Sequence, residues 1–339
     1  MTARGKSGNA TKVSAVGQGA GPPQRLVTRV VLEFLIDVLC ASAKAHDGDL
    51  KATVIFMAIQ RANIDFVDRD PERAVRCFGA TPDDTLRRPI TAHALSQSVS
   101  IPPETCRRHV ERLVAAGCCR RVGARGLISP GTVMQREPFA SLIDETRAAF
   151  LKMLESLRAI DFDVAAAAAA HRGAAEPVVA LSAEAMRFSL WAVANGYVVR
   201  VVLEGIEDQE RDFVRGLIFV TVMAMNVGHI THDLETAWRF AHANSPPPDD
   251  LRMPVGVRAV SDRLGIPYET TRQHLIRMVE IGRAKRVGAG YIIPATVNLE
   301  APFLRMGLNI YHWLLRAVDQ LERLGFDVAA ASPPPALSL

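Results

Sequence analysis

Apolar segments with helical spacing alternate with short polar breaks along this chain, and the same series of segments occurs twice. Residues 139–160 and 303–324 carry apolar side chains at intervals of three and four positions, which predicts one amphipathic helix in each half. Upstream, residues 49–63 and 212–226 are related apolar stretches of helical length. The two amphipathic helices need a partner surface, which is either the rest of their own half or each other. The pattern predicts a mainly α-helical protein with two similar halves.

The repeat is strongest at residues 89–124 and 254–289. Aligned without a gap at an offset of 165, these segments share 16 identities in 36 positions, and most differences are conservative. Upstream, residues 29–33 recur as residues 200–204. We therefore expect repeats at residues 25–164 and 178–328, an Ala-rich linker at 165–177 that is either helical or a flexible tether, a disordered arm at 1–24 and a tail at 329–339.

Each copy of the motif reads as two short helices followed by a basic β-hairpin. In the first copy, residues 92–99 and 103–116 are expected to be helical, with Gly117 as a left-handed C-terminal cap. Residues 119–122 and 127–129 are expected to form the hairpin. The buried stripe of the second helix should consist of Cys106, His109, Val110, Leu113 and Val114, and in the second copy of Thr271, His274, Leu275, Met278 and Val279. This order predicts winged helix-turn-helix domains at residues 89–133 and 254–298.

Positive charge is concentrated on the repeated motif. The chain has a net charge of +4, but residues 87–125 carry +6 and residues 252–290 carry +5, which leaves −7 on the remainder. Such a distribution is expected when the motif faces a phosphate backbone. We therefore expect double-stranded DNA as the partner.

Composition narrows the class of protein further. Five irregularly spaced cysteines fit neither a disulfide framework nor a paired zinc motif, which indicates a reducing cytoplasm. The first residues lack the apolar core of a signal peptide, and the longest apolar run, residues 217–227, is too short to span a bilayer. There is no phosphate-binding loop, nucleophile motif or zinc-protease signature. We expect neither an enzyme nor a cofactor, and no membrane partner.

Both copies contain the string E-T-x-R-x-H-[VL]-x-R-[LM]-V-x-x-G followed by an R-V-G-A hairpin. This resembles bacterial winged-helix transcriptional regulators of the MarR, GntR and IclR type, over about 45 residues per copy. The terminal helices of MarR-type proteins form a dimer interface, and the resemblance implies that role for residues 25–45, 139–160, 185–204 and 303–324. Because both copies share one chain, the resemblance implies a pseudo-dimer within a MarR-like helical framework.

Outward side chains near the start of the second helix are the expected DNA contacts. They are Pro103, Glu104, Thr105, Arg107 and Arg108 in the first copy, and Tyr268, Glu269, Thr270, Arg272 and Gln273 in the second, with Glu111 and Ile276 completing the same face. Arginine reads guanine, glutamine reads adenine and glutamate accepts from cytosine, whereas the threonines are expected to bind phosphate. The hairpin cations, expected to bind phosphates and position the protein, are Arg120, Arg121, Arg125, Lys285 and Arg286.

Three other clusters have structural and functional interpretations. His109 and His274 recur at one position, where a half-buried histidine bonded to a carbonyl is favoured over a proton or metal sensor. Cys106, Cys118 and Cys119 are read as structural thiols rather than a redox gate, since the second copy lacks them. The spacing His-x-x-His at His229 and His232, with Asp233 and His242 nearby, is too weak a signal to predict a metal site.

The two reading heads differ, with Arg108 opposite Gln273 and Pro103 opposite Tyr268. We therefore expect a cytoplasmic, nucleoid-associated transcriptional regulator that reads a bipartite, imperfectly palindromic DNA site. Two alternatives remain: a winged-helix protein-interaction or chromosome-architectural module, and a plasmid replication initiator. The sequence leaves open further homodimerisation and a small-molecule effector, for which it marks no residues.

Overall fold

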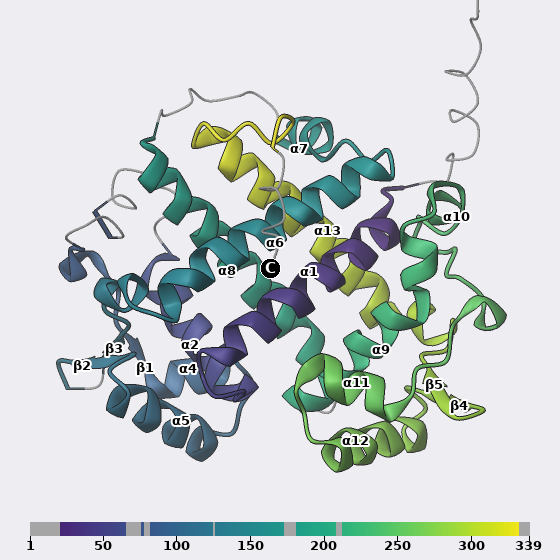
Figure 1. Ribbon diagram of the computed structural model, residues 1–339, viewed down its shortest axis with the longest axis horizontal. Helices are drawn as coiled ribbons and strands as arrows, with labels where there is room; N and C mark the ends of the chain where they lie inside the picture. Colours follow the sequence, from purple (N-terminus) through teal and green to yellow (C-terminus); the bar gives the residue numbers. More distant parts are fainter. Residues whose placement is uncertain are drawn as a thin grey trace, which may run out of the picture.

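The protein is described here by a computed structural model that covers residues 21–65, 76–77, 82–124, 126–172, 181–207 and 212–331. Within these residues it is mainly α-helical, as predicted, with twelve α-helices and two small antiparallel sheets (Figure 1). The arm at 1–20, Arg125, the end of the linker at 173–177 and the tail from 332 lie outside the described residues.

The helices follow one another in a similar order in the two halves. The first half contains α1 (Gln24–Lys44), α2 (Leu50–Asn63), α4 (Ala92–Ser98), α5 (Pro103–Ala115), α6 (Phe139–Ala159) and α7 (Val164–Arg172). The second contains α8 (Ala183–Glu207), α9 (Phe213–Thr231), α10 (Leu234–Arg239), α11 (Val257–Leu264), α12 (Tyr268–Glu280) and α13 (Ala301–Arg323). Short 3-10 turns are η3 (Asp84–Leu86), η4 (Gly131–Gln135), η5 (Asp249–Leu251) and η6 (Val297–Leu299). The sequence did not predict α10, and the described part of the Ala-rich linker is helical as α7.

Four long helices form the centre of the molecule (Figure 1). Helix α1 packs against α6 of its own half and α13 of the other, while α8 packs against α13 and α6 in the same way. The apolar stripes of α6 and α13 therefore pack on the first long helix of each half, α1 and α8, and not chiefly on each other. Phe34 of α1 packs edge-on against Phe150 of α6 and stacks on Tyr197 of α8. Phe150 is fully buried, so truncation to alanine should cost about 3–5 kcal/mol.

Each half also carries a helix–helix–hairpin unit on one supporting helix. Helix α2 supports α4 and α5, and α9 supports α11 and α12. Figure 1 shows the two units at the lower left and lower right, with α5 and α12 along the lower edge. Gly117 and Gly282, which follow α5 and α12, adopt φ of 67° and 72°, as the predicted left-handed caps require. The second copy repeats the local geometry of the first.

The hairpins are short and antiparallel. Strands β2 (Arg120–Val122) and β3 (Gly126–Ile128) pair with Arg121 opposite Leu127, and β1 (Ile90–Thr91) adds a third strand on the far side of β3. Strands β4 (Lys285–Val287) and β5 (Gly290–Ile292) pair with Arg286 opposite Tyr291. In place of β1, Val255 makes an isolated bridge to Tyr291. The sequence missed this third strand because two residues are too few to show alternation.

Candidate nucleic-acid interface

Helices α5 and α12 each bury one face and expose the other. In α5 the buried side chains are Cys106, His109, Val110 and Leu113, and in α12 they are Thr271, Leu275 and Met278. Val114 and His274 are only half-buried. The prediction that Val279 faces the core was wrong, since it is 39 % exposed. In this last turn of α12 the neighbouring Met278, which is fully buried, occupies the inward position.

The described residues of the predicted contact set lie on the exposed side or the hairpins. Exposed members are Pro103, Glu104, Arg107, Arg108, Arg120, Arg121, Tyr268, Glu269, Thr270, Gln273, Lys285 and Arg286, whereas Thr105 and Arg272 are half-buried. Arg125 falls outside the described residues. The outward face of α5 and α12 therefore groups arginine and glutamine donors with glutamate acceptors.

Glutamate and arginine side chains on this face pair with one another three residues apart. Arg107 donates two hydrogen bonds to Glu104, at 3.0 and 2.7 Å, and Arg272 donates two to Glu269, at 2.8 and 2.7 Å. Gln273 also donates to Glu269, at 2.6 Å. The hydrogen bond from Arg107 lowers the pKa of Glu104, and those from Arg272 and Gln273 lower the pKa of Glu269 to about 2. Both glutamates are therefore ionised at neutral pH and hold the arginine beside them.

The remaining cations of the face fall into two groups. Arg121 pairs with Glu111 at 2.8 Å and Arg120 with Asp84 at 3.3 Å. By contrast, Arg108, Lys285 and Arg286 have no ion-pair partner within the described residues. These three side chains are available to an external anion without breaking any described contact. Exposed pairs such as Arg121–Glu111 contribute little to stability, so the hairpin cations are readily released.

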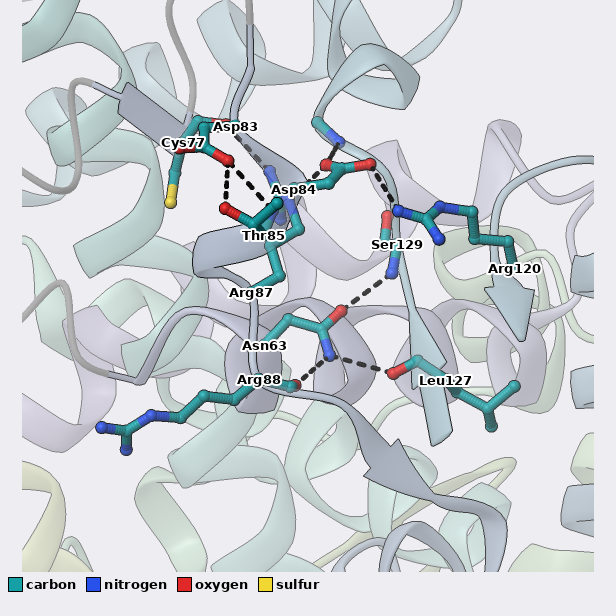
Figure 2. A network of polar contacts seen from close by, with 11 residues as sticks. Asn63, Cys77, Asp83, Asp84, Thr85, Arg87, Arg88, Arg120, Leu127 and Ser129 are labelled. Atoms are coloured by element: carbon teal, nitrogen blue, oxygen red, sulfur yellow. Dashed lines mark hydrogen bonds and ion pairs between the residues drawn. The ribbon is translucent and has the colours of Figure 1, made fainter. Parts of the chain in front are cut away.

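A buried asparagine fixes each hairpin to its supporting helix, and Figure 2 shows the first copy, around Asn63. The Asn63 side chain at the end of α2 donates to the carbonyls of Arg88 and Leu127, at 2.7 and 3.1 Å, and accepts from the Ser129 amide at 2.8 Å. Asn226 at the equivalent point of α9 makes the same three contacts, donating to the carbonyls of Met253 and Tyr291, at 2.7 and 3.0 Å, and accepting from the Ile293 amide at 2.9 Å. Both asparagines are completely buried, so each hairpin has a fixed orientation relative to its helix.

An aspartate in the 3-10 turn before each helix–helix–hairpin unit connects that turn to the segment after the hairpin. Asp84 accepts from the Gly131 amide at 2.9 Å, and Asp249 accepts from the Ala295 amide at 2.7 Å. In the first copy, Asp84 also pairs with Arg87 at 3.1 Å and with Arg120 of the hairpin (Figure 2). Sequence reasoning missed both connections. The signal was present, because Asn63 recurs as Asn226 in the aligned apolar stretches.

The two repeated histidines contact carboxylates rather than carbonyls, which corrects the prediction. His109 Nδ1 lies 3.2 Å from Asp49 Oδ2, and His274 Nδ1 lies 3.8 Å from Asp212 Oδ2. Each aspartate is the N-cap of the supporting helix and accepts backbone hydrogen bonds there. Burial lowers the pKa of both histidines, and the aspartates offset only part of this. The imidazoles are therefore neutral at neutral pH and lie next to these carboxylates, and His109 Nδ1 makes no hydrogen bond within the described residues.

The thiols beside the interface are buried. Burial raises the pKa of Cys106 to about 11 and that of Cys119 to about 12, and it raises that of Cys118 as well. Thiols that stay protonated react slowly. The described residues include no group of three or more His, Cys, Asp or Glu side chains placed to hold a metal ion. His232, from the weak His-x-x-His spacing, instead pairs with Glu33 at 3.0 Å.

Of the described helices, α9 alone is long and apolar enough to cross a bilayer, and most of it is buried in the protein, as in a core helix. Comparison of the chain with protein-family models, curated proteins and solved structures finds no match.

Proposed function

We propose that the protein is a sequence-specific, double-stranded DNA-binding transcriptional regulator with two winged helix-turn-helix heads in one chain. The observation that carries the proposal is the repeated helix–helix–hairpin unit, whose second helix exposes arginines in both copies while its other face packs on a supporting helix. In a winged helix, that second helix enters the major groove and the hairpin contacts the neighbouring backbone. The concentration of positive charge on the repeats supports the same assignment.

The central helices support a MarR-like pseudo-dimer. Helices α1, α6, α8 and α13 occupy the segments that the resemblance assigns to a dimer interface, and each contacts helices of both halves. Two heads joined in this way would meet successive major grooves about one helical turn apart, roughly 34 Å. Since Arg108 in the first copy corresponds to Gln273 in the second, the two half-sites should differ in sequence. We place the protein in the cytoplasm, bound to the nucleoid, and assign it no enzymatic activity.

One observation favours a protein-interaction module as a second candidate. In the second copy, Tyr268, Val279 and Val287 are large apolar residues exposed on α12 and its hairpin, at 46 %, 39 % and 37 %. A partner protein would cover such residues. The unpaired cations on the same surface favour DNA, because a phosphate backbone satisfies them without a matched acidic partner.

Selection of bound duplexes from a random DNA library tests the proposal with the purified full chain. A bipartite motif should be recovered, and Arg107→Ala with Arg272→Ala should weaken binding to it by about 1–3 kcal/mol for each arginine that reads a base. Arg239→Ala is the matched control, since Arg239 is an exposed helical arginine paired with Glu235 on α10, away from the heads. Recovery of no motif, with unchanged affinity in the double variant, would favour the interaction module.

A further inference from the structure

One aromatic side chain is exposed, whereas the other aromatic side chains that the structure describes are buried or half-buried. The exposed one is Tyr268, at 46 %. It is the first residue of α12 and follows Pro267. In a helix-turn-helix protein, the residues at the start of the second helix are the ones that contact base edges. The packing of the fold gives no reason for an exposed ring at this point.

An arginine from the neighbouring helix lies over this ring. The guanidinium carbon of Arg258, on α11, is 5.8 Å from the centre of the Tyr268 ring, within the range of a cation–π contact. The Arg258 side chain is itself 77 % exposed, and its carboxylate neighbour, Asp262, is 3.9 Å away. The contact restricts the orientations of the ring before any partner binds.

A second arginine is close to the same ring. Arg272 lies four residues after Tyr268 on α12, and residues at this spacing are neighbours on a helix. The pKa of Arg272 is raised by its hydrogen bonds to Glu269 and, to a smaller extent, by the nearby phenols of Tyr268 and Tyr291. The ring therefore lies among the donors of the predicted DNA face. A partner that approaches Arg272 also meets Tyr268.

The first head presents no aromatic residue at the equivalent place. Pro103 corresponds to Tyr268 and opens α5 as Tyr268 opens α12. His93 corresponds to Arg258. Proline is favoured in the first turn of a helix, so the helix can begin at this position without a tyrosine. The difference between the heads therefore concerns what each helix presents to the outside, and not how the helix starts.

The major groove offers one apolar group to such a ring. Thymine carries a 5-methyl group there, whereas the other base edges present hydrogen-bond donors and acceptors. Ring carbons cannot pair with those polar atoms, and covering them without a hydrogen bond costs free energy. Contact with the methyl group instead removes apolar surface of both molecules from water.

We propose that Tyr268 contacts the 5-methyl group of a thymine in the half-site read by the second head, and that Arg258 is a positioning residue that holds the ring. The first head, with Pro103, makes no such contact. The inference rests on the proposed function, since it requires α12 to lie in a major groove. It also accounts for the exposed ring without a partner protein.

Replacement of thymine by deoxyuridine tests the inference, because it removes the methyl group and keeps every hydrogen-bonding atom of the base. In the duplex that selection from a random library recovers, each thymine is replaced singly and affinity for the full chain is measured by fluorescence anisotropy. We expect one position, in one half-site, where deoxyuridine weakens wild-type binding roughly fourfold, as expected for one buried methyl group. At that position Tyr268→Pro, which copies the first head, should bind both duplexes equally.

Three further variants separate the ring from other contributions. Tyr268→Phe keeps the ring and should keep the preference for thymine over deoxyuridine. Arg258→Ala leaves the ring without its cation–π contact and should reduce that preference, whereas loss of a phosphate contact alone would weaken binding to both duplexes equally. Leu234→Ala removes an exposed apolar side chain on α10, away from the heads, and is the control that should behave as wild type.

The failure of this inference and the failure of the proposed function give different results. Sequence-specific binding with no deoxyuridine effect that depends on Tyr268 overturns the inference alone. A preference for thymine that is lost in Tyr268→Phe also overturns it, because the hydroxyl and not the ring would then make the contact. Recovery of no motif overturns both. Tyr268→Ala gives the same measurement if the proline variant fails to fold.

Discussion

Replacing Glu104 and Glu269 by glutamine is expected to make DNA binding tighter and more sensitive to salt. Each glutamate holds an arginine through two hydrogen bonds on the exposed face of α5 or α12. Glutamine removes the negative charge but keeps the size and one acceptor. Arg272 is then free to bind phosphate, and Arg107 keeps only a longer contact with Glu111, at 3.8 Å. Two negative charges also no longer face the expected DNA backbone.

The expected change in salt dependence follows from how many arginine and lysine side chains of the contact set are paired with carboxylates. Three described members of the contact set are unpaired, and these are Arg108, Lys285 and Arg286. Four more, Arg107, Arg120, Arg121 and Arg272, are paired with carboxylates. With about 0.9 counterions released per phosphate neutralised, the slope of log K against log salt is about −3 if all pairs persist and about −6 if all open. The double glutamine variant should add about −2, which corresponds to roughly 60-fold tighter binding at ~0.1 M salt.

Fluorescence anisotropy with a labelled duplex, measured over a series of salt concentrations, gives both quantities. Glu235→Gln is the matched control, because Glu235 is an exposed helical glutamate that pairs with Arg239 on α10. Equal slopes for wild type and the double variant would refute the reasoning, as would a control that shifts the slope equally. Lowering the pH to 5 should not imitate the variant, since the pKa of Glu269 is about 2.

Three further outcomes follow from the buried contacts. Asn63→Ala or Asn226→Ala leaves two carbonyls and an amide without their partner. Urea unfolding should therefore show that the free energy of unfolding falls by about 3 kcal/mol or more, whereas an alanine substitution at an exposed position should change it little. Because burial lowers the pKa of His109 and His274 in the folded state, the unfolded chain binds more protons as pH falls through about 6.5. The melting temperature should therefore drop from pH 7.5 to 5, and it should drop less when His109→Gln and His274→Gln are combined. Native protein should expose at most one of its five thiols, Cys40, to a thiol reagent, and all five after denaturation; rapid native labelling of more would contradict the buried placement.

Much of the fold was predictable because its helices are amphipathic and repeated. The apolar spacing of residues 139–160 and 303–324 predicted α6 and α13 to within a few residues, and the glycines after α5 and α12 marked their ends. Prediction failed where the chain offers no periodicity. Helix α10 has six residues and β1 has two, and their positions are set by packing against α9 and β3.

The candidate interface was predicted less completely than the fold. Residue type and spacing predict which side chains of α5 and α12 face outward. They predict separate base contacts for Glu104 and Arg107, however, and not a pair between them. Their three-residue spacing on a helix was a sign that they would pair with each other. The asparagine connections were also visible as matched positions in the repeat. The contacts of Arg25 and Arg29 with carbonyls of the second half were not predictable, because these residues lie about 210 to 270 positions from their partners and meet them only through the packing of α1 on that half.

Duplication within one chain has a consequence that a homodimer cannot have. In a homodimer, a substitution changes both subunits, so a residue that alters one head alters the other. Here Arg108 and Gln273 differ at equivalent positions, as do Gly196 and Arg25. Each difference breaks the equivalence of the halves at one place while the shared supports, Asn63 and Asn226, keep the framework the same. On the exposed helix face, Glu104 and Arg107 recur as Glu269 and Arg272, whereas Arg108 stands opposite Gln273. This combination is expected if the two halves bind half-sites that are related but not identical.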